Sequence, residues 1–83
     1  MKLNEVKNLI ERIDMHYDTN HSKDDDYVKE WYKELKKYDS EDVNRRLEEH
    51  LKGEYGNIPP KLYFLIKNLK TPEQKIKMGS IYT

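Results

Sequence analysis

The side chains with the most chemical potential cluster in the first third of the chain. Asp14, His16, Asp18 and His21 are all possible metal ligands, and three consecutive aspartates follow at positions 24–26. Residues two apart on a helix point about 200° away from each other, so His16 faces away from Asp14 and Asp18 and the three cannot ligate one metal from a single face. Three acids in the first turn of a helix instead face its unpaired amide groups and the positive end of its dipole. This pattern favours solvated loop residues and a capped helix start, and we expect no metal site here.

A catalytic arrangement is equally hard to build from the other candidates. His50 borders the apolar stripe of a helix, beside Leu47 and Leu51, and no Ser, Cys or paired carboxylate stands at a spacing that would use it as a base. The glycines are scattered, which argues against a phosphate-binding loop. Cysteine is absent, so the chain has neither a disulfide framework nor a thiolate metal site. We therefore expect no enzyme: no catalytic residue, no cofactor and no metal.

Charge is divided unevenly along a chain that is neutral as a whole. The 83 residues carry 16 basic and 16 acidic side chains. Residues 1–56 hold 11 of the basic and 15 of the acidic ones, a net −4, whereas residues 57–83 hold five lysines and Glu73, a net +4. A basic segment on an acidic body concerns partners rather than fold. No apolar run approaches the roughly 20 residues of a membrane helix, so we expect a cytoplasmic protein without a membrane partner.

Apolar residues recur with the period of a helix over four segments. Ser22 and Ser40 stand where they would cap the second and third helices, and Pro59-Pro60 would open the fourth. Thr71-Pro72 then starts a short fifth turn. The sequence thus predicts an all-α fold, a small bundle of four antiparallel-leaning helices over residues 1–70, with a short helical turn and a loosely ordered C-terminal tail over residues 71–83. The four stripes comprise Leu3, Val6, Leu9, Ile10, Ile13 and Tyr17; Tyr27, Val28, Trp31, Leu35 and Tyr38; Val43, Leu47 and Leu51; and Leu62, Leu65, Ile66 and Leu69.

Two features indicate a contact surface in the C-terminal third. Phe64 projects about 150° from the centre of its helix's apolar stripe, and Tyr63 and Lys67 lie on the same outer side. Either this helix is buried on two sides or Phe64 belongs to an interface. The last nine residues alternate lysines with large apolar side chains, which is typical of a frayed end or of a segment that orders on a partner. We interpret the following residues as partner-binding: Phe64, Lys67, Lys75, Ile76, Lys77, Met78, Ile81 and Tyr82.

The order of these signals is similar to that of a known family. Residues 31–51 read WYKELKKYDSEDVNRRLEEHL, a short Gly-containing loop follows, and residues 58–69 read IPPKLYFLIKNL. This order resembles the replicative helicase loader and inhibitor family from phages of low-GC Gram-positive bacteria. Shared features are a Trp-containing second helix, an Asp-x-x-x-Val start to the third, a His near its end and a double proline before the fourth. The positions concerned are Trp31, Leu35, Asp39, Val43, Leu47, His50, Pro59 and Pro60.

The resemblance implies a non-enzymatic adaptor. Such proteins bind a hexameric replicative DNA helicase, inhibit it, and help to load it at a phage replication origin, often through an origin-binding initiator protein. The resemblance also implies an ordered N-terminal helical domain and a flexible tail, here from Thr71 onward, that carries the helicase contact in the cytoplasm of the host cell. This tail is short for the family, as expected of a truncated chain.

Two other functions stay open. One is the inhibition of a host replication factor, which uses the same kind of protein contact on a different target. The other is a small nucleic-acid-binding helical module that would place its C-terminal lysines on phosphates. The acidic body would repel a duplex, so we expect nucleic acid to be bound at most weakly or indirectly. The lysines concerned are Lys61, Lys67, Lys70, Lys75 and Lys77.

Overall fold

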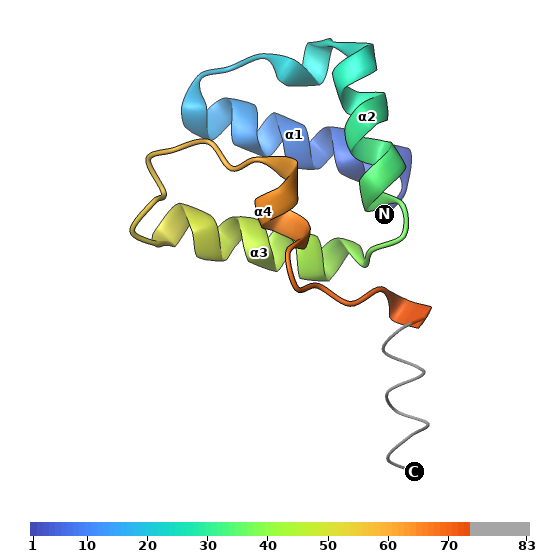
Figure 1. Cartoon of the computed structure of the whole chain (residues 1–83). Helices are drawn as coiled ribbons and strands as arrows, with labels where there is room; N and C mark the ends of the chain where they lie inside the picture. Colours follow the sequence, from blue (N-terminus) through green and yellow to red (C-terminus); the bar gives the residue numbers. More distant parts are fainter. Residues whose placement is uncertain (74–83) are drawn as a thin grey trace.

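The computed structural model describes residues 1–73, and every element of regular secondary structure in this range is a helix (Figure 1). This confirms the predicted all-α class. The predicted tail anchors Lys75, Ile76, Lys77, Met78, Ile81 and Tyr82 lie outside the described residues, and the predicted division at residues 70 and 71 stays a prediction. The elements are α1 (Leu3–Tyr17), a 3-10 turn η1 (His21–Lys23), α2 (Asp25–Leu35), α3 (Ser40–Lys52) and α4 (Leu62–Ile66).

The second and third helices begin close to where the sequence predicts, but different residues cap them. Asp24, not Ser22, caps α2, and its carboxylate accepts hydrogen bonds from the amides of Asp26 and Tyr27. Asp39, not Ser40, caps α3, since its Oδ1 accepts from the amide of Glu41 at 2.8 Å. Both aspartates have extended backbone, which is the conformation that lets a cap side chain reach the first free amides. The acidic run at 24–26 thus serves a helix start.

The fourth helix is shorter than the sequence predicts. Pro60 does not open it, because Lys61 is still extended (φ −82°, ψ 155°) and the helical residues begin at Leu62. Asn68 adopts a positive φ of 63°, the left-handed conformation that ends helices. Of the predicted stripe, Leu65 is buried, while Leu62, Ile66 and Leu69 are partly buried against the core.

The first and third helices lie side by side, while α2 crosses one end of the pair (Figure 1). Arg12 of α1 donates to Asn44 and Glu48 of α3 at 2.9 and 3.1 Å. The α-amino group of Met1 donates to the carbonyls of Leu35 and Tyr38 at the end of α2 and just after it, at 3.3 and 2.6 Å. These contacts tie the start of the chain to the end of α2 and join α1 to α3.

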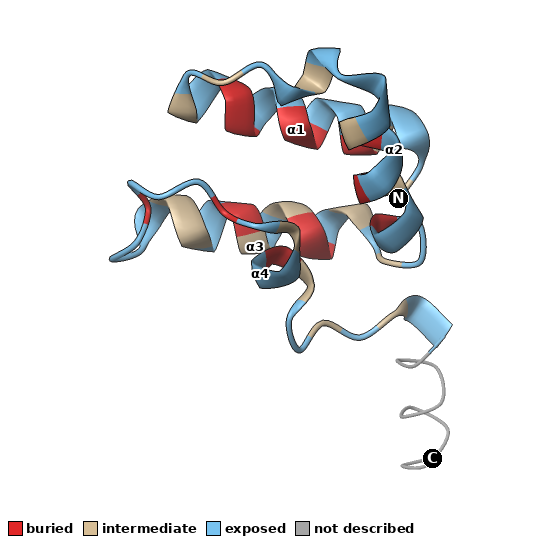
Figure 2. Cartoon of the chain, turned by 45° about the horizontal axis from the view of Figure 1, so that its top comes forward, coloured by how far each residue is buried: buried red, intermediate tan, exposed pale blue. Residues whose placement is uncertain are grey.

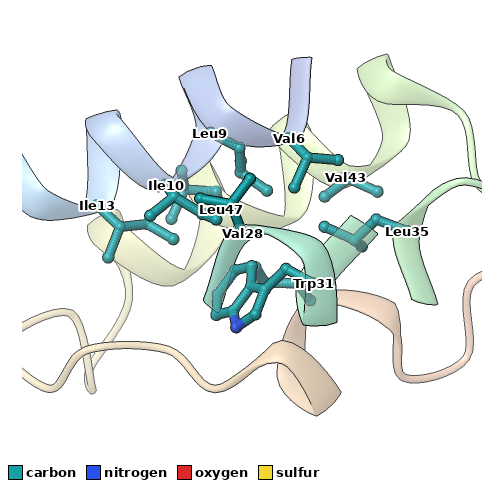
Figure 3. Packing of buried hydrophobic residues seen from close by; sticks show 10 residues of the cluster. Val6, Leu9, Ile10, Ile13, Val28, Trp31, Leu35, Val43 and Leu47 are labelled. Atoms are coloured by element: carbon teal, nitrogen blue, oxygen red, sulfur yellow. The ribbon is translucent and has the colours of Figure 1, made fainter. Parts of the chain in front are cut away.

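The core is a single cluster drawn from all four helices (Figure 3). Figure 2 shows its buried residues on the facing sides of α1, α2 and α3. Leu3 departs from the predicted stripe, since it remains 49% exposed at the start of α1. Each fully buried aliphatic or aromatic side chain contributes about 1.5–3 kcal/mol relative to exposure. The members are Val6, Leu9, Ile10, Ile13, Val28, Trp31, Leu35, Val43, Leu47 and Leu65.

Candidate partner-binding surface

The outer face of α4 is exposed at the predicted position. Phe64 is 56% exposed and its neighbour Tyr63 is 64% exposed, whereas Leu65 is 1% exposed. Helix α4 therefore buries one side and presents the other (Figure 2). The alternative of a helix buried on two sides is wrong. That Phe64 contacts a partner stays a prediction.

Phe64 does not stand alone, because it forms one wall of an apolar cleft. The other walls are His50 near the end of α3 and three residues of the connection from α3 to α4: Tyr55, Ile58 and Pro59. The cleft has a volume of about 290 Å³, at the lower end of the range for small-molecule sites. It offers room for a partner's side chain rather than for a nucleotide-sized cofactor.

A more polar hollow continues from this cleft along the end of α3. It shares His50, Tyr55 and Phe64 with the cleft, and it adds Arg46, Glu49 and Glu54 at its rim, as well as Gly53 and Leu65. Both rim carboxylates are exposed. Together the two hollows make one surface, which we call the aromatic cleft: an apolar floor with charged groups along one edge.

Two hydrogen bonds hold the connecting loop that forms the cleft. His50 donates from Nε2 to the carbonyl of Ile58 at 2.6 Å, so this nitrogen carries a proton. The hydroxyl of Tyr17, at the end of α1, donates to the carbonyl of Gly56 at 2.6 Å. Burial raises the pKa of the Tyr17 hydroxyl, which keeps it a donor. The cleft walls are thus fixed from both α1 and α3.

The C-terminal end of α4 is also hydrogen-bonded to α3. Arg46 donates from Nη2 to the carbonyl of Lys67 at 2.5 Å, just after the last helical residue. The side chain of Lys67 is exposed but does not line the aromatic cleft. The structure therefore brings Phe64 together with Tyr55 and Ile58 in one cleft. That Phe64 and Lys67 bind the same partner stays a prediction.

Sequence reasoning missed the loop residues of the cleft. Tyr55 and Ile58 are 65% and 53% exposed. They lie in a loop, where apolar residues follow no helical period, so the pattern that predicts the helices does not reveal them. A signal was present all the same. A tyrosine and an isoleucine between Gly53 and a double proline are large apolar residues in a loop, which is otherwise the place for polar side chains.

The acidic and histidine cluster of the first third has a structural use. Asp14 is buried and accepts from the Thr19 hydroxyl at 2.7 Å and from the amides of His21 and Ser22 at 3.1 and 2.9 Å. Burial raises the pKa of Asp14, but the hydrogen bonds outweigh it and hold the pKa below its ordinary value. Within residues 1–73, no three acidic, histidine or cysteine side chains gather as a metal site would need.

Fold and site define a small all-α domain with an exposed aromatic cleft fixed on its surface. In the part of the chain that is described, no helix is long and apolar enough to cross a membrane.

A family model for the N-terminal domain of a phage helicase loader/inhibitor matches residues 1–66, and the chain belongs to this family. The family that the sequence resembled is thereby confirmed. It is associated with helicases and is not a known catalytic family. Comparisons with curated proteins and with solved structures found no match.

Proposed function

We propose that this protein is a non-enzymatic adaptor that binds a hexameric replicative DNA helicase, inhibits it, and helps to load it at a phage origin. The family match over residues 1–66 carries the proposal. It spans α1 to α4, so the part of the chain that builds the core is also the part that the family shares.

The site residues of this proposal are those of the C-terminal third. Phe64 supplies an exposed aromatic side chain, the kind that contributes most at protein interfaces. The lysines and apolar residues from Lys75 to Tyr82 supply the remaining anchors, with Lys67 as an exposed cation beside α4. Lysines at an interface rim mainly set the association rate and its salt dependence, so their loss should affect the rate of binding more than the residence time.

The experiment mixes the full chain with a purified hexameric replicative helicase, from phage or host, and follows complex formation by size-exclusion chromatography with light scattering. Unwinding of a forked DNA substrate is measured in parallel. We expect a stable complex and a fall in unwinding as the chain is added.

Absence of a complex with both helicases would overturn the proposal. If a host replication factor other than the helicase were retained instead, the inhibitor alternative would replace it. An origin-binding initiator added to the helicase complex tests loading, because a loader should release active helicase onto origin DNA whereas a pure inhibitor should not.

A further inference from the structure

Large apolar side chains are unevenly distributed over the exposed surface of the described residues. Six are strongly exposed, and four of them, Tyr55, Ile58, Tyr63 and Phe64, come from the short segment between α3 and the end of α4. Leu3 and Met15 are the other two, both on α1. Exposed apolar groups that gather in one patch mark an interaction site, whereas single ones need no explanation.

The polar groups around the aromatic cleft are not equally available to a ligand. His50 already donates to the carbonyl of Ile58. Arg46 donates from one nitrogen to the carbonyl of Lys67, a neutral acceptor that leaves its positive charge in place. The carboxylates of Glu49 and Glu54, by contrast, are exposed at the rim. An incoming partner therefore meets apolar side chains and three charged groups, of which the two carboxylates outnumber Arg46 and leave a net charge of −1.

This combination selects the chemistry of an occupant. The excess of carboxylates over Arg46 disfavours a phosphate backbone, which argues against nucleic acid. A large aliphatic or aromatic side chain fits a hollow of about 290 Å³. A lysine or arginine next to it would lie against the carboxylates, and its charge would also be attracted to the faces of Tyr55 and Phe64.

The loop that lines the cleft is held from two sides, and the chain after α4 leaves in another direction. The loop is fixed to α1 through Tyr17 and to α3 through His50. In both views, residues 67–73 leave α4 on the side opposite to the loop between α3 and α4 (Figures 1 and 2). A preformed cleft of this kind binds without the cost of ordering its walls.

We infer that the aromatic cleft of Tyr55, Ile58 and Phe64 is a docking site for a segment of a partner protein, one that presents a large apolar side chain with a lysine or arginine beside it. This site is separate from the tail and does not depend on the helicase being the partner.

The test uses the full chain and a phage-displayed library of random peptides. We expect enrichment of sequences with an aromatic or aliphatic residue next to Lys or Arg. The best peptide is then made with a fluorescent label, and its affinity for each variant is measured by anisotropy.

Phe64→Ala and Tyr55→Ala should each weaken peptide binding about tenfold or more, as expected of central aromatic anchors. The double variant Glu49→Gln/Glu54→Gln should weaken peptide binding several-fold at low salt and less at high salt. The matched control is Tyr63→Ala, which removes an equally exposed ring from the same helix but does not line the cleft. Met15→Ala is a second control on α1, and the melting temperature of every variant is recorded.

Several results would overturn the inference: no enriched peptide, enriched peptides that are acidic, or an equal loss of binding for Tyr63→Ala and Phe64→Ala. If a synthetic peptide of residues 74–83 displaced the selected peptide at similar concentration, the chain's own C-terminal segment would be the occupant instead of a partner. Because no helicase is present in this experiment, the inference and the proposed function can fail independently.

Discussion

At the scale of single residues, Asp14 is the clearest case of a polar side chain that determines local structure. Its carboxylate collects one hydroxyl and two amide donors from the segment that links α1 to α2. A buried carboxylate with several donors is stabilising only while it is ionised. Ser22, which gives its amide to Asp14, is thereby drawn into the 3-10 turn and does not serve as the cap of α2.

Asp14→Ala should lower the free energy of unfolding by about 1–3 kcal/mol, because it leaves partly buried donors without their acceptor. Glu11→Ala, an exposed acid one turn earlier on α1, is the control and should change little. Chemical denaturation at neutral pH measures both.

The effect of Asp14 should also depend on pH. Its pKa is lower in the folded chain than its ordinary value of 3.8, so the unfolded chain binds the proton more readily and the stabilisation is complete well above that value. As the pH falls below about 4, the difference in stability between the wild-type chain and Asp14→Ala should shrink. A difference that stays constant through the acid range, measured by denaturant titration at a series of pH values, would contradict this role.

At the scale of elements, the loop between α3 and α4 is built by close backbone approach. Gly56 is buried, and a Cβ at this position would collide with the carbonyl of Leu51. Its own carbonyl accepts from Tyr17. The absence of a side chain at Gly56 is thus what allows the loop to lie against the end of α3 and to form a wall of the aromatic cleft.

Gly56→Ala should therefore destabilise the domain by about 1–3 kcal/mol, the usual cost of forcing an extra group into a packed position. Asn57→Ala, at the next and exposed position of the same loop, should be nearly neutral. Thermal melts followed by circular dichroism compare the two. A melting temperature for Gly56→Ala equal to that of Asn57→Ala would show that the loop is not held as described.

The elements also show what the sequence could and could not predict. The stripes around Val6, Trp31 and Leu47 follow from the sequence because burial imposes a helical period on apolar residues. The same geometry places Phe64 off its stripe, but the sequence alone leaves open whether that side is buried or exposed. The cap of α2 was misassigned, since Ser22 and Asp24 have similar local capping ability and a contact between Ser22 and Asp14, eight residues away, decides between them. The sequence does not predict the cleft, because hydrogen bonds between residues far apart in the chain shape its loop and leave no periodic pattern in the sequence.

At the scale of the whole molecule, stability depends on a thin core shared by four helices. Trp31 is 6% exposed and stacks on Tyr27 with ring centroids 5.4 Å apart. A domain of this size has only about 5–15 kcal/mol of net stability. One large side chain at the centre is therefore a substantial part of the total.

Trp31→Ala should cost about 3–5 kcal/mol of unfolding free energy. Met15→Ala, which truncates an 87% exposed side chain, is the control and should leave the melting curve in place. Denaturant titration with circular dichroism measures the two variants. An unchanged midpoint for Trp31→Ala, or a spectrum dominated by strand, would contradict the packing of this core.

The charge distribution of the whole chain predicts weak binding to DNA. Its five lysines beyond residue 56 could neutralise at most five phosphates, which would give a log–log salt slope of about −4.5 on a duplex. The acidic body opposes that contact, so we expect only weak binding at physiological salt. Fluorescence anisotropy with a labelled duplex is the measurement, and a sub-micromolar complex with a steep salt dependence would favour the nucleic-acid alternative.

The most direct test of the adaptor function is a titration of a labelled replicative helicase hexamer with the full chain, with a chain that ends at Gln74, and with Phe64→Ala. We expect the full chain to bind, the shortened chain to lose binding with a nearly unchanged melting temperature, and Phe64→Ala to bind more weakly while staying folded. Each apolar anchor should contribute about 1–2 kcal/mol or more. Normal binding by the shortened chain would place the helicase contact within residues 1–74 instead of the tail. Failure of the full chain to bind would contradict the adaptor function as a whole.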